Sequence, residues 1–154
     1  MTRFVITPAT EADLPELIEL LAVLFAIEQD FMPNADKQRR GLTQLLASAT
    51  GHIVLARDAG TMRAIGMATA QWLISTAEGA PSAWIEDVVV RETWRGQGVG
   101  RALLEAALQW AASQGAVRAQ LLADKDNAPA QAFYEELGWQ PTCLVARRLM
   151  LNKT

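Results

Sequence analysis

The segment that most constrains this chain is a glycine-rich loop between an apolar run and a long amphipathic helix. Ala83–Arg91 is typical of a strand, Gly98–Gln114 of a helix with one apolar face, and Arg95–Gly100 joins them. A helix start carries unpaired N–H groups and the positive end of the helix dipole, and glycines let a phosphate approach those groups. Arg95 and Arg101 can add charge-assisted hydrogen bonds. The segment therefore predicts an α/β fold with an anion-binding site at the helix N-terminus.

Two common phosphate-binding motifs do not fit this loop. A P-loop needs a Lys after its last glycine, and none follows here. The dinucleotide fingerprint needs a glycine where this chain has Arg101, although Asp124 lies at about the right distance at a predicted strand end. That fingerprint normally opens its domain, whereas a predicted hairpin precedes this loop and too little chain follows for a doubly wound sheet. A strand-to-helix turn that binds nothing stays open as the alternative on this motif alone.

The periodicity of the whole chain predicts ten elements in the order βααβββαβαβ, a mixed sheet with helices on its faces. Thr10–Asp13 resembles a capping box in front of a helix of about 18 residues. Asp58–Thr61 predicts the turn of a hairpin. The predicted strands are Arg3–Pro8, His52–Arg57, Arg63–Ser75, Ala83–Arg91, Ala116–Ala123 and Pro141–Leu151. The apolar face of the first helix includes Leu14, Leu17, Ile18, Leu21, Leu24 and Phe25, and the other predicted helices cover Asp36–Ala49, Gly98–Gln114 and Ala128–Leu137.

Length and composition exclude several other classes of protein. With 154 residues, 51% of them hydrophobic, the chain suits one domain over residues 1–154 with its own core. The net charge of −3 argues against nucleic acid as a partner. The longest apolar run, Leu20–Ile27, is far shorter than the roughly 20 residues of a membrane span. The single Cys143 and single His52 predict no disulfide and no metal site, and they favour a cytoplasmic protein.

Two motifs together resemble one family. Arg95-x-x-Gly98-x-Gly100 is similar to the acetyl-CoA signature of the Gcn5-related N-acetyltransferases, the GNAT superfamily, and Ile85–Val90 resembles that family's central strand. Downstream, Asn127 and Ala132–Trp139 are similar to its second motif, with Trp139 where Phe is more common. The order of elements matches along almost the whole chain, and the sharp motifs cover Trp84–Trp139. The resemblance implies a GNAT-like fold, acetyl-CoA as cosubstrate and a primary amine as acceptor.

The resemblance also implies roles for individual residues. Backbone N–H groups of Val88 and Val90 would bind the pantetheine and the thioester oxygen, as an oxyanion hole does. Tyr134, the only tyrosine, would protonate the departing thiolate, and its alternative role is that of a core aromatic. The implied cofactor-binding residues are Val88, Val89, Val90, Arg95, Gly96, Gln97, Gly98, Val99, Gly100, Arg101 and Asn127, where Asn127 is equally explained as a helix N-cap.

Glu86 is the predicted general base. Successive side chains of a regular strand alternate between faces, so Glu86 and Asp87 are expected to point in opposite directions, with Trp84 on the face of Glu86. In similar polyamine acetyltransferases the first acid of such a pair is the proposed base, which implies Glu86. A structural pairing of Glu86 with an arginine is the alternative. The acidic stretch Glu28–Asp36, which includes Asp30, suits a cationic acceptor, although such loops are often merely solvated.

The leading functional hypothesis is an acetyl-CoA-dependent N-acetyltransferase that acts by direct attack of a primary amine of a small, cationic molecule. The alternative is a non-catalytic acyl-CoA-binding or regulatory domain, which would need neither Glu86 nor Tyr134. A nucleotide-binding module is disfavoured by the two motif mismatches. A homodimer is a further expectation, because many members of the family are homodimers and the apolar Pro141–Leu151 would suit an interface.

Overall fold

The computed structural model describes residues 3–28 and 31–152 and divides the chain into two compact units, Met1–Leu122 and Ala123–Thr154. The first unit contains the sheet, and the second contains one helix in its described residues. The single domain over residues 1–154 stays a prediction. None of the helices in the described ranges has the length and apolar character needed to cross a membrane.

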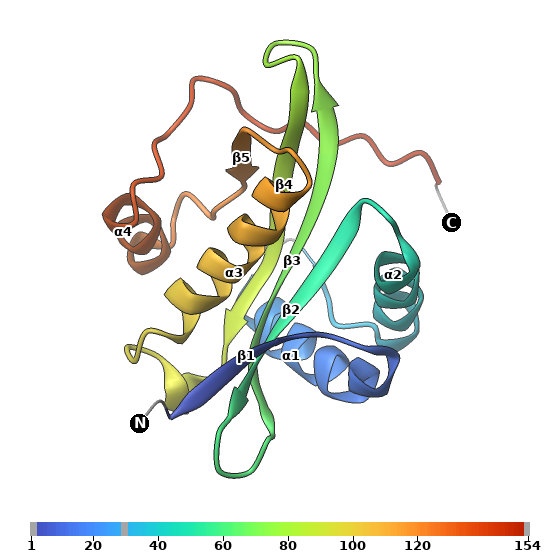
Figure 1. The fold of residues 1–154 in the computed structure, drawn as a ribbon, viewed down its shortest axis with the longest axis vertical. Coiled ribbons are helices and arrows are strands. Elements are labelled where there is room, and N and C mark those ends of the chain that lie inside the picture. The colour runs from blue at the N-terminus through green and yellow to red at the C-terminus, as the bar shows by residue number, and fades with distance from the viewer. Residues whose placement is uncertain (1–2, 29–30, 153–154) are drawn as a thin grey trace. The chain divides into compact units, whose positions relative to one another are not determined.

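The first unit is built on a five-stranded sheet in the order β1-β2-β3-β4-β5 (Figure 1). β1 to β4 are antiparallel neighbours, and β5 pairs in parallel with β4. The parallel step is made by a helical crossover between β4 and β5, as parallel strands require. The strands are β1 (Phe4–Pro8), β2 (Gly51–Asp58), β3 (Ala64–Ser75), β4 (Ala80–Val90) and β5 (Arg118–Leu121).

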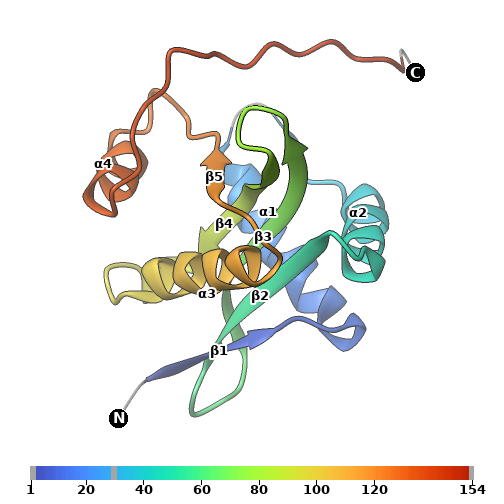
Figure 2. The same cartoon turned by 45° about the horizontal axis from the view of Figure 1, so that its top comes forward.

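Helices cover both faces of this sheet. α1 (Leu14–Ile27) and α2 (Ala35–Ala47) lie on one face, and α3 (Val99–Ser113) lies on the other (Figures 1 and 2). The predicted capping box of Thr10 and Asp13 is present, and it closes a short 3-10 turn that leads into α1. The core between α1, α2 and the sheet is formed by aliphatic side chains of Leu17, Leu20, Leu21, Leu24, Leu42, Ile53, Leu55, Met67 and Val89.

A glycine allows α3 to approach the sheet closely. A Cβ atom at Gly66 of β3 would lie 2.9 Å from the carbonyl oxygen of Val89 and 3.0 Å from Cδ1 of Leu103. Both distances are shorter than ordinary contacts, so a side chain here would push the helix away. The close packing holds the beginning of α3, and the glycine-rich loop before it, beside the end of β4.

The structure confirms the predicted fold class and nine of the ten predicted elements, with boundaries that differ by at most three residues apart from the first helix, whose α-helical part has 14 residues rather than about 18. The second unit contains α4 (Ala128–Glu136), as predicted. The predicted strand Pro141–Leu151 is wrong: within the described residues this segment forms no ladder. Its apolar side chains are exposed, Leu149 at 83% and Leu151 at 93%. A strand exists only through hydrogen bonds to a neighbour, and β-branched or apolar composition alone does not supply one. The homodimer stays a prediction, and its support from a paired final strand is gone.

Candidate active site

The glycine-rich loop has the backbone that the sequence predicted for an anion cradle. A 3-10 turn at Glu92–Trp94 leads into it, and Gly98 is the N-cap residue of α3. Gly96 and Gly98 have φ angles of 73° and 85°, a left-handed conformation that favours glycine. A Cβ atom at either position would meet nothing within 4 Å. The loop therefore leaves open space beside the unpaired N–H groups at the start of a 15-residue helix.

Three arginines surround this loop. Nε of Arg95 donates to the carbonyl oxygen of Val90 at 3.1 Å, and Nε of Arg101 donates to Glu105 at 3.0 Å. The third, Arg3, comes from the beginning of the chain: its Nη1 donates to Oε1 of Gln97 at 2.9 Å, and its guanidinium lies 5.1 Å from the ring centre of Trp94. Arg3 was not predicted. It lies 94 positions from Gln97, and no local pattern connects the two residues.

Half of β4 has a free edge on the side of β5. The parallel ladder pairs Ser82–Ile85 with Arg118–Leu121 and ends there, so no described residue of β5 pairs with Glu86–Val90. On the other side, the N–H of Arg91 donates to Ile65 of β3 at 2.8 Å. Because N–H groups alternate along a regular strand, that of Val90 points away from β3, towards the free edge. The predicted use of the Val90 donor is compatible with this geometry, while the Val89 side chain is buried in the core. Val88 lies where the register between β3 and β4 shifts, so the use of its N–H group stays a prediction.

A β-bulge interrupts β4 at the acidic pair. Met67 of β3 is opposite Val89, but Thr69 is opposite Glu86, so Asp87 and Val88 together face one residue of β3. Asp87 has a φ angle of 53°, which is unusual for a residue other than glycine. The expectation that Glu86 and Asp87 point in opposite directions is wrong, because the bulge breaks the alternation. Asp87 accepts a hydrogen bond from the Thr69 hydroxyl at 3.3 Å, and Thr69 shares its face with Glu86 across the ladder.

The two carboxylates have different surroundings. Burial, followed by the negative charges of Glu86 and of Glu28 at the end of α1, raises the pKa of Asp87 to about 6, and the Thr69 hydrogen bond opposes this shift. Glu86 is exposed, and its Oε1 accepts from the indole Nε1 of Trp84 at 2.6 Å. The prediction that Trp84 shares the face of Glu86 is thereby confirmed. Asp30, which was part of the predicted acidic stretch, lies outside the described residues.

In the second unit, the motif residues are held by α4. The side chain of Asn127 accepts from the N–H of Ala130 at 3.1 Å and caps the helix, which confirms the capping interpretation. Tyr134 is half-buried, and its ring makes edge contacts with Phe133 at 5.1 Å and Trp139 at 6.1 Å between ring centres. The aromatic contacts fix the orientation of the only phenol in the chain.

Comparison with known proteins decides the family. The model of the acetyltransferase (GNAT) family matches residues 16–139. This chain belongs to the GNAT acetyltransferase family. The acetyltransferase is 30% identical over 112 residues to the aminoglycoside N(6')-acetyltransferase type 1 of Stenotrophomonas maltophilia, a match that covers 71% of this chain and 73% of that protein. It is 40% identical over 81 residues to the mycothiol acetyltransferase of Corynebacterium aurimucosum, which covers 52% of this chain and 27% of that protein.

Solved structures share the fold of this chain. An aminoglycoside acetyltransferase from an uncultured soil metagenomic sample, solved with trehalose, has a TM-score of 0.79 at 25% identity, and the match covers 97% of both chains. A transcriptional regulator from Bacillus halodurans has a TM-score of 0.82 at 25% identity and covers 96% of this chain and 99% of its own. The family makes this acetyltransferase an enzyme with acetyl-CoA as acetyl donor.

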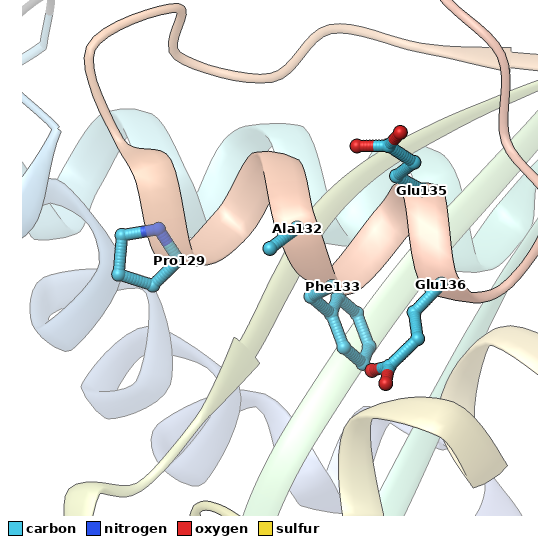
Figure 3. A pocket seen from close by; sticks show the side chains of 5 residues that line it. All are labelled: Pro129, Ala132, Phe133, Glu135 and Glu136. Atoms are coloured by element: carbon cyan, nitrogen blue, oxygen red, sulfur yellow. The ribbon is translucent and has the colours of Figure 1, made fainter.

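The open space at Gly96 and Gly98, the start of α3 and the nearby arginines fit the pyrophosphate of acetyl-CoA. A separate hollow lies on the surface of α4 and is lined by Pro129, Ala132, Phe133, Glu135 and Glu136 (Figure 3). None of these five residues was predicted to bind cofactor or acceptor. Among the described residues, no group of three or more His, Cys, Asp or Glu side chains is arranged to hold a metal ion.

Proposed function

We propose that this enzyme transfers the acetyl group of acetyl-CoA to a primary amine of a small cationic molecule, by direct attack of the amine on the thioester. One observation supports this class of acceptor. Glu86 and Asp87 place two carboxylates on one face of β4, in the half of the strand that has no ladder to β5. Such a face attracts ammonium groups and repels anionic acceptors.

In this proposal, different residues bind the cofactor, polarise the thioester and transfer protons. The loop Arg95–Gly100, with Arg101, would hold the pyrophosphate, and the N–H groups of Val88 and Val90 would polarise the thioester carbonyl. The phenol of Tyr134 would give its proton to the departing thiolate, because a group with a pKa near 10 can protonate the anion of a thiol with a pKa near 8.5. The acidic pair would promote loss of a proton from the acceptor, a step for which the sequence favoured Glu86.

The relatives support a cationic acceptor. The Stenotrophomonas maltophilia protein is named for acetylation of aminoglycosides, and these compounds carry several amino groups that are protonated at neutral pH. The indole of Trp84, which donates to Glu86, adds an aromatic wall beside the acidic pair. Proteins commonly bind an ammonium group between a carboxylate and the face of an aromatic ring.

A panel of acceptors tests this function. Thiol release from acetyl-CoA is measured with spermidine, an aminoglycoside, glycine and glutamate, each at low and high salt. We expect turnover with spermidine or the aminoglycoside, and we expect kcat/KM to fall as salt screens the acidic face. Turnover restricted to glycine or glutamate would refute the cationic acceptor but keep the acetyltransferase. Binding of acetyl-CoA by calorimetry with no turnover of any amine would instead favour the non-catalytic acyl-CoA-binding domain.

A further inference from the structure

We propose that Asp87, the residue at the bulge of β4, takes the proton from the acceptor ammonium group, and that Glu86 binds that group beside it. The assignment rests on the proposed acetyltransferase function. It reverses the role that sequence alone favoured, in which the first acid of the pair is the base.

The backbone supplies the first argument. In a regular strand Asp87 would face away from Glu86, and only one of the two acids could reach the acceptor. The bulge and the φ angle of 53° turn Asp87 to the side of Thr69 instead. A left-handed conformation is unfavourable for most residues with a Cβ, and Asp is among the few that adopt it more often. Bulges that re-aim a side chain are common beside active sites, where such strain is retained for function.

The second argument is the environment of each carboxylate. Among the described residues, the charged and polar side chains that act on Asp87 are Glu28 at the end of α1, Thr69 from β3 and Glu86 on its own strand. With a pKa of about 6, Asp87 is ionised at neutral pH yet is a stronger base than an ordinary carboxylate. Glu86 is exposed and oriented by the indole of Trp84, so it presents a negative charge to an incoming ammonium group.

The proton balance of the reaction is simple. The ammonium group of the acceptor loses one proton to Asp87, and the neutral nitrogen then attacks the thioester carbon. As the C–N bond forms and the C–S bond breaks, the nitrogen loses a second proton, and the departing sulfur takes a proton from the phenol of Tyr134. The second nitrogen proton offsets the one that the phenol gives to the sulfur, and Asp87 releases the first to solvent. One proton is released per acetyl group transferred.

The pH dependence of kcat/KM separates the two acids. For the wild type we expect kcat/KM to rise with pH through the pKa of Asp87, since only the ionised carboxylate accepts a proton. This rise is the acidic limb of the pH profile. Asp87→Asn should remove the limb and lower kcat by about 100-fold or more, within the range of general base catalysis. Glu86→Gln should keep the limb but move it to lower pH, because a negative charge that raises the pKa of Asp87 is gone.

Thr69→Val provides an independent readout. The Thr69 hydroxyl lowers the pKa of Asp87, so its removal should move the limb to higher pH while the limb itself remains. A residue that only supported the fold would not shift the limb in opposite directions in Thr69→Val and Glu86→Gln. The proposal is overturned if Glu86→Gln abolishes the limb and Asp87→Asn retains it.

Separate controls distinguish a misfolded variant, or failure of the proposed function, from a wrong assignment of Asp87. Asn, like Asp, is one of the non-glycine residues that adopt the left-handed conformation most often, so Asp87→Asn should fold, and Asp87→Gly is a second variant that relieves the backbone strain. Acetyl-CoA affinity by calorimetry should be similar in wild type and all variants. If the wild type acetylates no amine, the proposed function fails; if it does and Asp87→Asn keeps its pH limb, only the assignment of Asp87 fails.

Discussion

The cofactor loop and the acidic face of β4 lie close together in the chain but are encoded differently. The loop depends on local features: two left-handed glycines, a helix start and neighbouring arginines. The acidic face depends on how β4 pairs with β3, and its bulge is set by contacts between strands. A motif that acts through its own backbone can therefore be predicted from sequence, whereas the direction of a side chain in a bulged strand cannot.

The largest expected effect comes from filling the loop. Gly98→Glu should weaken acetyl-CoA binding by about 100-fold or more, equivalent to about 2.7 kcal/mol, because a carboxylate would occupy the open space meant for a phosphate. Calorimetry with the folded variant measures this. Gly98→Ala should show only the cost of the φ angle of 85°.

Gly41→Glu is the matched control for the loop variant. Gly41 lies on the exposed side of α2, and an added Cβ there meets nothing within 4 Å. It adds the same charge away from the loop and should leave affinity unchanged. Equal affinity of Gly98→Glu and the wild type for acetyl-CoA would remove the basis for a cofactor loop.

The next largest effect concerns Tyr134. Tyr134→Phe keeps the ring that packs against Phe133 and Trp139 and removes only the hydroxyl. We expect kcat to fall by about tenfold to a thousandfold, with little change in the KM for acetyl-CoA, as for loss of a general acid. Pre-steady-state measurement of the chemical step is the test. An unchanged chemical step would make Tyr134 a packing aromatic only.

The raised pKa of Asp87 should make the free energy of unfolding depend on pH. The folded pKa of Asp87, about 6, is above its unfolded value near 3.8, so the folded state binds more protons between these limits. The free energy of unfolding therefore falls as pH rises from about 4 to about 6. In Asp87→Asn the free energy of unfolding should not show this fall, which in the wild type is on the order of 1–3 kcal/mol. Thermal melts of both proteins at pH 4, 5, 6 and 7 measure it, and a difference in Tm that does not grow with pH contradicts the prediction.

The sequence was sufficient for the order of the elements, the glycine loop and the caps at Thr10 and Asn127, because each depends on residues within a few positions of one another. It failed where partners are distant. The bulge that redirects Asp87 is defined only by the register with β3, and Pro141–Leu151 has apolar composition but no paired neighbour among the described residues. The roles of Glu86 and Tyr134 stay predictions, since they depend on the position of a substrate.

The smallest expected effect, at Arg3, tests whether the cofactor loop is as local as its motif suggests. Arg3 joins the first strand to the loop through Gln97 and Trp94, and all of these contacts are at least partly exposed. Exposed hydrogen bonds and cation–π contacts contribute about 0.5–1 kcal/mol each, so Arg3→Ala should weaken acetyl-CoA binding about threefold to tenfold without changing kcat. Arg63→Ala, which removes an exposed arginine in the turn between β2 and β3, is the control for charge.

A double-mutant cycle with Gln97→Ala separates the two ways in which Arg3 can act. A positioning role gives a coupling energy between Arg3 and Gln97, whereas a direct attraction of phosphate by Arg3 gives additive losses of affinity. Acetyl-pantetheine, which lacks the pyrophosphate, should bind the wild type and Arg3→Ala equally. If Arg3→Ala binds acetyl-CoA as the wild type does, the loop is held by its own residues, and the contrast between a locally encoded cofactor site and a register-dependent acceptor face becomes complete.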